Sequence, residues 1–397
     1  MPILKACGTK IVDGKTPVLL RGVNLGGWLM PEGYIMHAPN RGYRFFRQHF
    51  VKTLGEKTCD ELESGFRQNF IMERDFERIA ALGLNCIRLP FHYALIETRP
   101  RVYSEAGAAW IDQAITWAGK YGLRVILDMH AAPGAQNHDW HSDSDGQALF
   151  WKNKTFQRRA IALWQFLAKR YRDEPVVAGY DLLNEPILGD SRQLNAYYRD
   201  AIKAIRTVDR QHIVFLKGLA WAQDLKCLDQ FDDDNYVLSF HAYEPADFTF
   251  NLLPGIQYPP SGIGMAKCRA QMQQRIAALK AVADKHRVPV WCGEFGVNAR
   301  GGACGEDIWL KDILKYFESM NIHWTYWTWK AIKNHMFPDG VYSYVPNDVW
   351  VNRAGPLSGW DTWHMYWKSR KKEMMRSWRT EAFTVNAAIV KELKYAA

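Results

Sequence analysis

Eight short apolar runs that alternate with longer amphipathic stretches are the feature that most constrains the fold of this chain. The runs predict buried strands at residues 18–24, 85–89, 124–130, 176–184, 212–216, 236–241, 289–294 and 323–329. Apolar residues at helical spacing predict helices at 106–121, 156–171, 194–205, 267–286 and 308–320. Between the fifth and sixth strands the candidate helix, 221–230, is short. Strands that alternate with helices predict an all-parallel sheet.

Eight strand–helix units predict that this sheet closes into a (β/α)8 barrel, the TIM-barrel fold of the α/β class. A chain of 397 residues suits one barrel domain over residues 1–397, with insertions expected near 31–67 and 331–378. A doubly wound open sheet is the alternative, but it more often has a glycine-rich phosphate turn after its first strand. Here that strand leads into RGVNLGGW (21–28), which has neither GxGxxG nor GxxxxGK spacing. The barrel is therefore favoured.

Charge, cysteine content and terminal sequence argue against several classes of function. The net charge of +9 comes from basic residues interleaved with acidic ones, and a solvated face explains the densest run, KSRKK (368–372), so no nucleic-acid partner is expected. Seven cysteines without a CxxC pair do not form a disulfide framework. The start, MPILKACGTK, lacks the features of a secretory signal, and no run is long enough to span a membrane. We expect a cytoplasmic protein, or a secreted one if a signal was trimmed; the oligomeric state is left open.

Polar side chains stand at the ends of seven of the predicted strands, where catalytic residues of barrels collect. A run such as VILDMH (125–130) would bury its polar residues, and buried polar groups need partners. Their co-occurrence predicts one shared polar site. The residues are Asn24, Arg88, Asp128, His130, Asn184, Glu185, His241, Tyr243, Glu294, Trp327 and Trp329. Taken singly, Arg88 has the alternative of a structural ion-pair partner, and His130 and His241 that of core histidines.

Two glutamates of this set, Glu185 and Glu294, suit acid–base chemistry on an acetal. A protonated carboxyl can donate to the leaving oxygen, and an ionised one can attack the anomeric carbon. Retaining glycosidases hold the two carboxyls about 5–5.5 Å apart, whereas inverting enzymes leave a wider gap for water. We therefore predict Glu185 and Glu294 as the catalytic residues of a glycosidase.

The segment HDWHSDSD (138–145) is rich in possible metal ligands. A metal or calcium site is one interpretation, but the loop lacks the fixed spacing of zinc ligands. We favour a polar loop above the barrel mouth, with Trp140 and Trp151 as stacking surfaces for a substrate. The 17 Trp in the chain agree with either an aromatic core or a cleft for sugar rings.

Several motifs resemble glycoside hydrolase family 5. Asn184-Glu185-Pro186 is similar to the family's acid/base motif, and Gly293-Glu294-Phe295-Gly296 is similar to its nucleophile strand. The resemblance runs from Arg21 to about Lys330. It implies that Glu185 is the general acid/base, that Glu294 is the nucleophile and that six supporting residues bind substrate or assist. These are Arg88, His130, Asn184, His241, Tyr243 and Trp327.

Within the family, RGVNLGGWL (21–29) and DMHAAPGAQN (128–137) resemble the exo-β-1,3-glucanase branch and its bacterial relatives. Phe295-Gly296 after the nucleophile departs from that branch and is also found among endoglucanases, so the linkage is not fixed by the resemblance.

The expected function is retaining hydrolysis of β-glucans or β-glucosides through a covalent glycosyl-enzyme, with a carbohydrate as partner and with no metal or organic cofactor. Two alternatives remain. One is a hydrolase of another β-glycoside, such as mannan or a glucosylated lipid or sterol, with a pocket shaped by 31–67 and the aromatic C-terminal region. The other is a barrel that binds carbohydrate without turnover.

Overall fold

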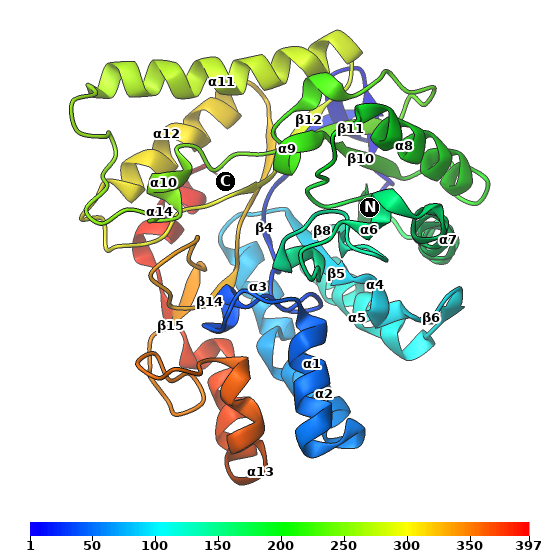
Figure 1. Cartoon of the computed structure of the whole chain (residues 1–397). Helices are drawn as coiled ribbons and strands as arrows, with labels where there is room; N and C mark the ends of the chain where they lie inside the picture. Colours follow the sequence, from blue (N-terminus) through cyan, green and yellow to red (C-terminus); the bar gives the residue numbers. More distant parts are fainter. Residues whose placement is uncertain (397) are drawn as a thin grey trace.

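Eight parallel strands close into a barrel in the computed structural model, which describes residues 1–396 (Figure 1). Neighbouring strands follow one another around the barrel in chain order, and β13 pairs with β4 to close it. This confirms the (β/α)8 prediction, and every predicted apolar run overlaps a barrel strand. The strands are β4 (Arg21–Asn24), β5 (Cys86–His92), β8 (Arg124–Ala131), β9 (Val177–Asp181), β10 (Ile213–Lys217), β11 (Tyr236–His241), β12 (Val290–Phe295) and β13 (His323–Tyr326).

Amphipathic helices cover the outside of the barrel. In α7, for example, Leu163, Trp164 and Leu167 are buried on one face. Side-chain oxygens of Ser104, Asn153 and Asp190 accept from backbone N–H groups at the starts of α5, α7 and α8, which caps them. The covering helices are α3 (Glu73–Ala81), α5 (Glu105–Lys120), α7 (Lys154–Tyr171), α8 (Ser191–Arg206), α11 (Met265–His286) and α12 (Glu306–Ser319).

The helix predicted at 221–230 is wrong. β10 and β11 are joined instead by the short α9 (Leu219–Ala222) and the 3-10 turn η3 (Leu225–Cys227). Ala220, Trp221 and Ala222 have φ of 54°, 54° and 62°, in the left-handed region, and this backbone cannot propagate a right-handed helix. The connection becomes a turn that presents Trp221 at the barrel mouth.

A small antiparallel sheet closes the N-terminal end of the barrel. It consists of β1 (Lys5–Cys7), β2 (Lys10–Asp13) and β3 (Thr16–Val18). Leu4, Ile11 and Leu20 are buried against side chains of the barrel interior, which include Phe215 and Trp291. A packed interior of this kind leaves the C-terminal ends of the strands as the place for a site.

The segments expected as insertions pack against each other. Helices α1 (Tyr43–Leu54) and α2 (Glu56–Phe70) stand beside α13 (Trp360–Ser377) (Figure 1). Phe46 stacks on Trp360 at 5.4 Å between ring centroids, and Trp363 and Trp367 are buried in the same layer. The tryptophans of α13 therefore join the hydrophobic core that packs around the barrel.

Short elements complete the chain. β14, β15 and β16 form a three-stranded sheet, and α14 packs on α12. Within residues 1–396, no helix is both long and apolar enough to cross a bilayer, and all seven cysteines, which lie in that range, are unpaired. The short elements are η1 (Tyr34–Met36), α4 (Tyr93–Ile96), β6 (Glu97–Arg99), β7 (Val102–Tyr103), η2 (Trp140–Ser142), α6 (Leu149–Lys152), α10 (Ala246–Thr249), β14 (Lys330–Ile332), β15 (Tyr342–Tyr344), η4 (Thr380–Ala382), β16 (Thr384–Val385) and α14 (Ala387–Ala396).

Candidate active site

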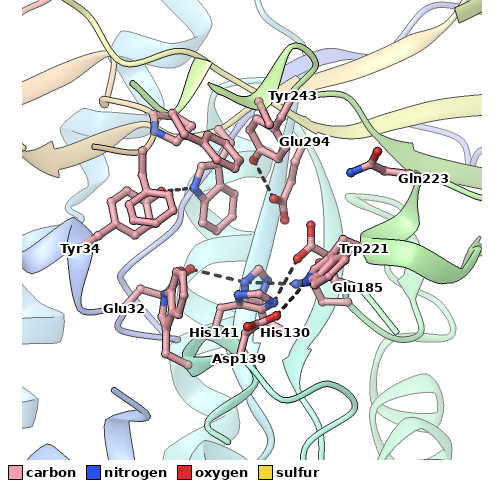
Figure 2. Close-up of a pocket in the computed structure, with 17 residues that line it drawn as sticks. Glu32, Tyr34, His130, Asp139, His141, Glu185, Trp221, Gln223, Tyr243 and Glu294 are labelled. Atoms are coloured by element: carbon pink, nitrogen blue, oxygen red, sulfur yellow. Dashed lines mark hydrogen bonds and ion pairs between the residues drawn. The ribbon is translucent and has the colours of Figure 1, made fainter. Parts of the chain in front are cut away.

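A cavity of about 290 Å³ opens at the C-terminal ends of the barrel strands. The carboxylates of Glu185 and Glu294 point toward one another at its centre (Figure 2). Glu32 and Tyr34 lie on one side of this pair, and Trp221 and Gln223 lie on the other. The cavity therefore offers a pair of acidic groups between two chemically different walls.

Glu294, on β12, is held by two donors. Arg88 Nη1 donates to its Oε1 at 2.5 Å, and the Tyr243 hydroxyl donates to its Oε2 at 2.8 Å. Tyr243 lies two residues beyond the end of β11, and burial together with Glu294 raises the pKa of its phenol well above the usual value. Tyr243 therefore keeps its proton and acts as a donor to the carboxylate.

Arg88 lies in the barrel interior, fully buried below the glutamates. Its Nη2 pairs with Asp128 Oδ2 and its Nε with Asp181 Oδ2, both at 2.9 Å. Lys217 forms a further ion pair with Asp181. Burying these charges is tolerable because they compensate one another and form hydrogen bonds. Arg88 does not line the cavity, so it acts on Glu294 rather than directly on a ligand there.

Glu185 follows β9 with a left-handed backbone, φ 43°. This conformation is uncommon for a residue with a side chain, and non-glycine outliers of this kind cluster at functional sites. Two buried amides hold the turn. Gln136 Nε2 donates to Asn184 O at 2.8 Å, and Asn137 Nδ2 donates to Glu185 O at 2.9 Å. The end of the 128–137 motif thus fixes the backbone that aims Glu185 into the cavity.

Two histidines contact the Glu185 carboxyl, one at each oxygen. His241 Nδ1 lies 2.6 Å from Oε1, and His141 Nε2 lies 3.0 Å from Oε2. Burial alone would raise the pKa of Glu185, but the two imidazoles outweigh it and hold that pKa well below its ordinary value. The pKa of His141 moves the opposite way: burial would lower it, and Glu185 raises it. A proton can therefore exchange between carboxyl and imidazole at this end of the site.

The two glutamates are close enough to act on one atom. One ligand oxygen from each, together with a ring nitrogen of His241, lie within 4.8 Å of one another. Among the residues described, no other group of three His, Cys, Asp or Glu residues has ligand atoms so close together, and the 138–145 loop contributes none. The loop side chains instead bind protein: Asp139 accepts from Trp221 Nε1 at 2.7 Å, and Asp143 contacts His92 at 2.9 Å. The loop is a polar wall of the cavity.

One wall of the cavity suits the ring of a sugar. The Trp327 and His130 rings stack with centroids 5.3 Å apart and 8° between planes, and Trp327 Nε1 donates to the Tyr34 hydroxyl. Burial alone would lower the pKa of His130. Asp128, 2.7 Å from His130 Nδ1, outweighs burial and raises that pKa to about 10. Glu32 lies 3.4 Å from His130 Nε2. An aromatic plane beside charged donors and acceptors matches the apolar faces and hydroxyls of a pyranose.

The structure brings together most of the residues predicted from the sequence. Six of them line the cavity: His130, Asn184, Glu185, Tyr243, Glu294 and Trp327. Arg88 and His241 were predicted to bind substrate, but they do not line it and contact the glutamates instead. Asn24 likewise lies outside the lining and accepts from Arg88.

Two tryptophans predicted near the site lie elsewhere. Trp151 does not line the cavity, because its indole donates to Gln136 O and its ring packs against Phe150 and Tyr197. Trp329 points into the core, where it donates to Asp75. Trp140 does line the cavity, as predicted.

Some lining residues were not singled out from the sequence: Glu32, Tyr34, Asp139, His141, Trp221, Gln223, Ala246, Phe250, Phe337 and Pro338. Glu32 and Tyr34 follow the 21–29 motif closely, and His141 is in the ligand-rich loop, so proximity to those motifs was the available signal. Phe337 had no such signal in the sequence, because it lies far from every motif named above and is brought to the cavity by folding.

Comparison with known proteins agrees with this geometry. Residues 52–333 match the model of the family described as Cellulase (glycosyl hydrolase family 5). A protein named beta-xylosidase from Phanerodontia chrysosporium is 35% identical over 346 residues, which cover 84% of this chain and 71% of that protein. Endoglucanase C of Acetivibrio thermocellus is 28% identical over 344 residues, which cover 78% of this chain and 91% of that protein.

Solved structures share the fold. Thermotoga maritima Cel5A, solved as a mutant form with cellobiose, superposes with a TM-score of 0.64 at 19% identity, covering 94% of this chain and 96% of that one. The cellulose synthase subunit CcsZ of Clostridioides difficile superposes with a TM-score of 0.63 at 20% identity, covering 95% of this chain and 99% of that one. Barrel and site define a glycoside hydrolase. More narrowly, the chain belongs to glycoside hydrolase family 5.

Proposed function

We propose that this protein hydrolyses β-glucans or β-glucosides with retention of anomeric configuration, by double displacement. The observation that carries the proposal is the proximity of Glu185 and Glu294, which contribute oxygens to a group of atoms within 4.8 Å of one another. Retaining enzymes place their carboxyls about 5–5.5 Å apart, and inverting enzymes about 6.5–9.5 Å apart. Oxygens this close fit the retaining spacing better than the wider inverting one, so they favour direct attack by a carboxylate.

The partners of the two glutamates support a different role for each. Glu294 receives hydrogen bonds from the Arg88 guanidinium and the Tyr243 phenol, and both favour a negative carboxylate, the form needed in a nucleophile. Glu185 contacts imidazoles, which can both give and take a proton. We therefore assign Glu294 as nucleophile and Glu185 as general acid/base.

In the first step the sugar ring packs on Trp327, with its hydroxyls toward His130, Glu32 and Asn184. The Asn184 amide is oriented by Arg88 Nη2, which donates to its Oδ1 at 2.8 Å. Its Nδ2 lies 3.3 Å from His130 Nε2, and its second N–H can donate to the 2-hydroxyl. Glu294 attacks C1, the glycosidic C–O bond breaks, and the proton from Glu185 passes to the leaving oxygen.

In the second step a water molecule replaces the leaving group beside Glu185. The water loses its proton to Glu185 as its oxygen attacks C1, and the bond between C1 and Glu294 breaks. Glu294 carries no negative charge while it is esterified, which favours ionisation of nearby Glu185 and prepares it to act as a base.

Covalent trapping tests this proposal directly. A 2,4-dinitrophenyl 2-deoxy-2-fluoro-β-glucoside should inactivate the enzyme in a time-dependent manner, because the good leaving group allows the first step while the fluorine slows the second. Peptide mass analysis should find one glycosyl group on the peptide that contains residues 293–296. A label on any other peptide, or turnover with inversion measured by NMR, would contradict the proposal.

The sugar and linkage rest on the relatives, which differ in name. They include endoglucanases, glucan 1,3-beta-glucosidases and a beta-xylosidase. A panel of aryl β-glucoside, β-xyloside and β-mannoside with laminarin, barley β-glucan, soluble cellulose and mannan separates these possibilities. The 35% identity to the protein named beta-xylosidase makes β-xylosides the second candidate. No hydrolysis of any substrate would favour a carbohydrate-binding barrel.

The aromatic wall at Phe337 favours attack at the end of a sugar chain. Phe337 packs against Tyr34, Phe250 and Trp140, with ring centroids 5.1, 5.4 and 5.5 Å apart. Trp140 follows β8, and Phe337 lies between β14 and β15 in the segment after β13, so their contact joins loops across β4 and β5. This contact closes the cavity on the side of Trp327, while on the side of Trp221 the indole donates a hydrogen bond to Asp139 Oδ2 at 2.7 Å. We therefore propose that one glycosyl unit fits beyond the cleaved bond.

Replacement of Phe337 by alanine should open this wall. Wild-type enzyme is expected to release mainly monosaccharide from laminarin, and Phe337→Ala should also release longer products. Because an aromatic contact contributes about 0.5–1.5 kcal/mol, kcat/KM on an aryl β-glucoside should fall by up to about tenfold. Product sizes by chromatography are the measurement. Phe45→Ala, at an exposed position on α1, is the matched control and should leave products unchanged.

A further inference from the structure

His141 is the residue of the 138–145 loop whose position the proposed chemistry does not yet explain. Only 12% of its side chain is exposed, and it reaches the Glu185 oxygen that His241 leaves free. His241 Nδ1 occupies Oε1 at 2.6 Å, so a proton carried by this carboxyl belongs on Oε2, which faces His141 Nε2 at 3.0 Å. The separation of these two atoms is that of a hydrogen bond, and a hydrogen bond between them requires one proton.

The Asn137 amide biases where that proton resides. Its Oδ1 accepts from Asp139 N and its Nδ2 donates to Glu185 O, both at 2.9 Å, so the amide cannot flip. The same Nδ2 lies 2.9 Å from His141 Nε2. An amide NH2 only donates, so this contact is favourable when Nε2 is an unprotonated acceptor. In this arrangement the proton is on Glu185, the state a general acid needs, whereas His141 and His241 together move the pKa of Glu185 below its ordinary value.

The charges around His141 act in the opposite direction. Glu185 from the end of β9, Glu32 from the loop after β4 and Asp139 from its own loop all favour the imidazolium. The His130 ring lies 6.1 Å away, and His241 faces the far oxygen of Glu185. The Asn137 amide favours the proton on Glu185, whereas the surrounding carboxylates favour it on His141. These opposing effects bring the two arrangements closer in energy.

We propose that His141 is a positioning residue that shares one proton with Glu185. This sharing extends to higher pH the range in which the pair holds the proton that the general acid donates. The inference rests on the proposed roles of Glu185 and Glu294. When the glycosidic C–O bond breaks, this proton goes to the leaving oxygen and the pair becomes carboxylate and neutral imidazole. When water attacks C1, the proton that water loses restores the pair.

The sign of the pH effect follows from this sharing. Glu185 raises the pKa of His141, so the pair retains its single proton to a higher pH than an isolated carboxyl can. The pair loses that proton on the basic limb of the profile of kcat/KM against pH. Without His141, the proton is lost from the carboxyl alone, and the basic limb moves to lower pH.

A leaving-group series in His141→Asn separates proton delivery from mere support. Phenyl β-glucoside needs acid assistance and should lose about tenfold or more in kcat/KM at neutral pH, within the contribution of general acid catalysis. 2,4-Dinitrophenyl β-glucoside needs little assistance and should change by less than about threefold on the same reasoning. The basic limb should shift to lower pH. His138→Asn, in the same loop with a half-exposed side chain 3.8 Å from Asp139, is the matched control and should behave like wild type.

Equal losses on both substrates with an unchanged basic limb would overturn the proposal, because they describe a structural role. Labelling by the 2-fluoro glucoside reports whether the site is intact, and it should proceed in both His141→Asn and His141→Gln. Failure to label either variant would also overturn the proposal, since His141 would then be needed to build the site. A wild-type label away from residues 293–296 would instead contradict the proposed function, so the two failures are distinguishable.

Discussion

Substitution of Glu294 by glutamine is expected to lower kcat on an aryl β-glucoside by roughly 10⁴-fold or more, a loss on the scale seen when an enzyme loses its nucleophile. Glutamine has the same size but cannot form the glycosyl ester. Its NH2 group would also face either Arg88 Nη1 or the Tyr243 hydroxyl, both of which donate to the carboxylate in the wild-type protein. The initial rate of phenol release measures the effect, and the 2-fluoro glucoside should no longer label the protein.

The matched control is Glu105→Gln, which makes the same chemical change at an exposed position on α5. It should retain wild-type kcat. Thermal unfolding of Glu294→Gln should still be cooperative, because the Asp128 and Asp181 contacts continue to hold Arg88. Wild-type hydrolysis by Glu294→Gln would remove Glu294 as the nucleophile and direct attention to Glu185.

The barrel could be predicted because its determinants are local. Each strand is a short apolar run that is buried on both faces, and each long helix shows one apolar face, so a few residues of sequence contain the signal. The 221–230 segment failed because three successive residues, Ala220 to Ala222, adopt left-handed backbone. Trp221 then reaches Asp139 across the barrel mouth, a contact between residues 82 positions apart that no local pattern contains.

The chemistry of the site could be predicted further than its geometry. Polar residues after strands located Glu185, Glu294, His130 and Tyr243, since parallel strands bring their carboxyl ends to one face. The position of His141 beside Glu185 could not be predicted, because its loop is placed by distant partners. Asp143 of that loop accepts from Arg44 N at 2.9 Å and contacts His92 at the same distance.

Arg88 shows a second limit. The sequence indicated a polar residue at the end of a strand, and both a ligand contact and an ion pair were open to it. Its register on β5 places the guanidinium below the cavity, among Asp128, Asp181 and Glu294. Whether a strand-end residue touches substrate or supports one that does depends on its depth in the barrel, which strand patterns do not encode.

The acid/base assignment gives the other large effect. Glu185→Ala should lower kcat/KM on phenyl β-glucoside by about 10²–10⁴-fold, because the leaving oxygen then departs without a proton. 2,4-Dinitrophenyl β-glucoside should still form the glycosyl-enzyme at a rate near that of wild type, since its phenolate leaves unaided. Hydrolysis of that intermediate should become slow, because no base activates water. Stopped-flow traces should therefore show a burst of one phenolate per enzyme followed by a slow steady state.

Azide distinguishes this role from general damage to the site. A small anion can occupy the space left by the Glu185 side chain, and azide needs no base to attack C1. The steady-state rate of Glu185→Ala on the dinitrophenyl substrate should rise with azide concentration, and the product should be β-glucosyl azide, because two displacements at C1 retain configuration. Glu294→Gln should not give the β product under the same conditions. An α-glucosyl azide from Glu185→Ala would exchange the two assignments, since it would mean that Glu185 is the group that attacks C1.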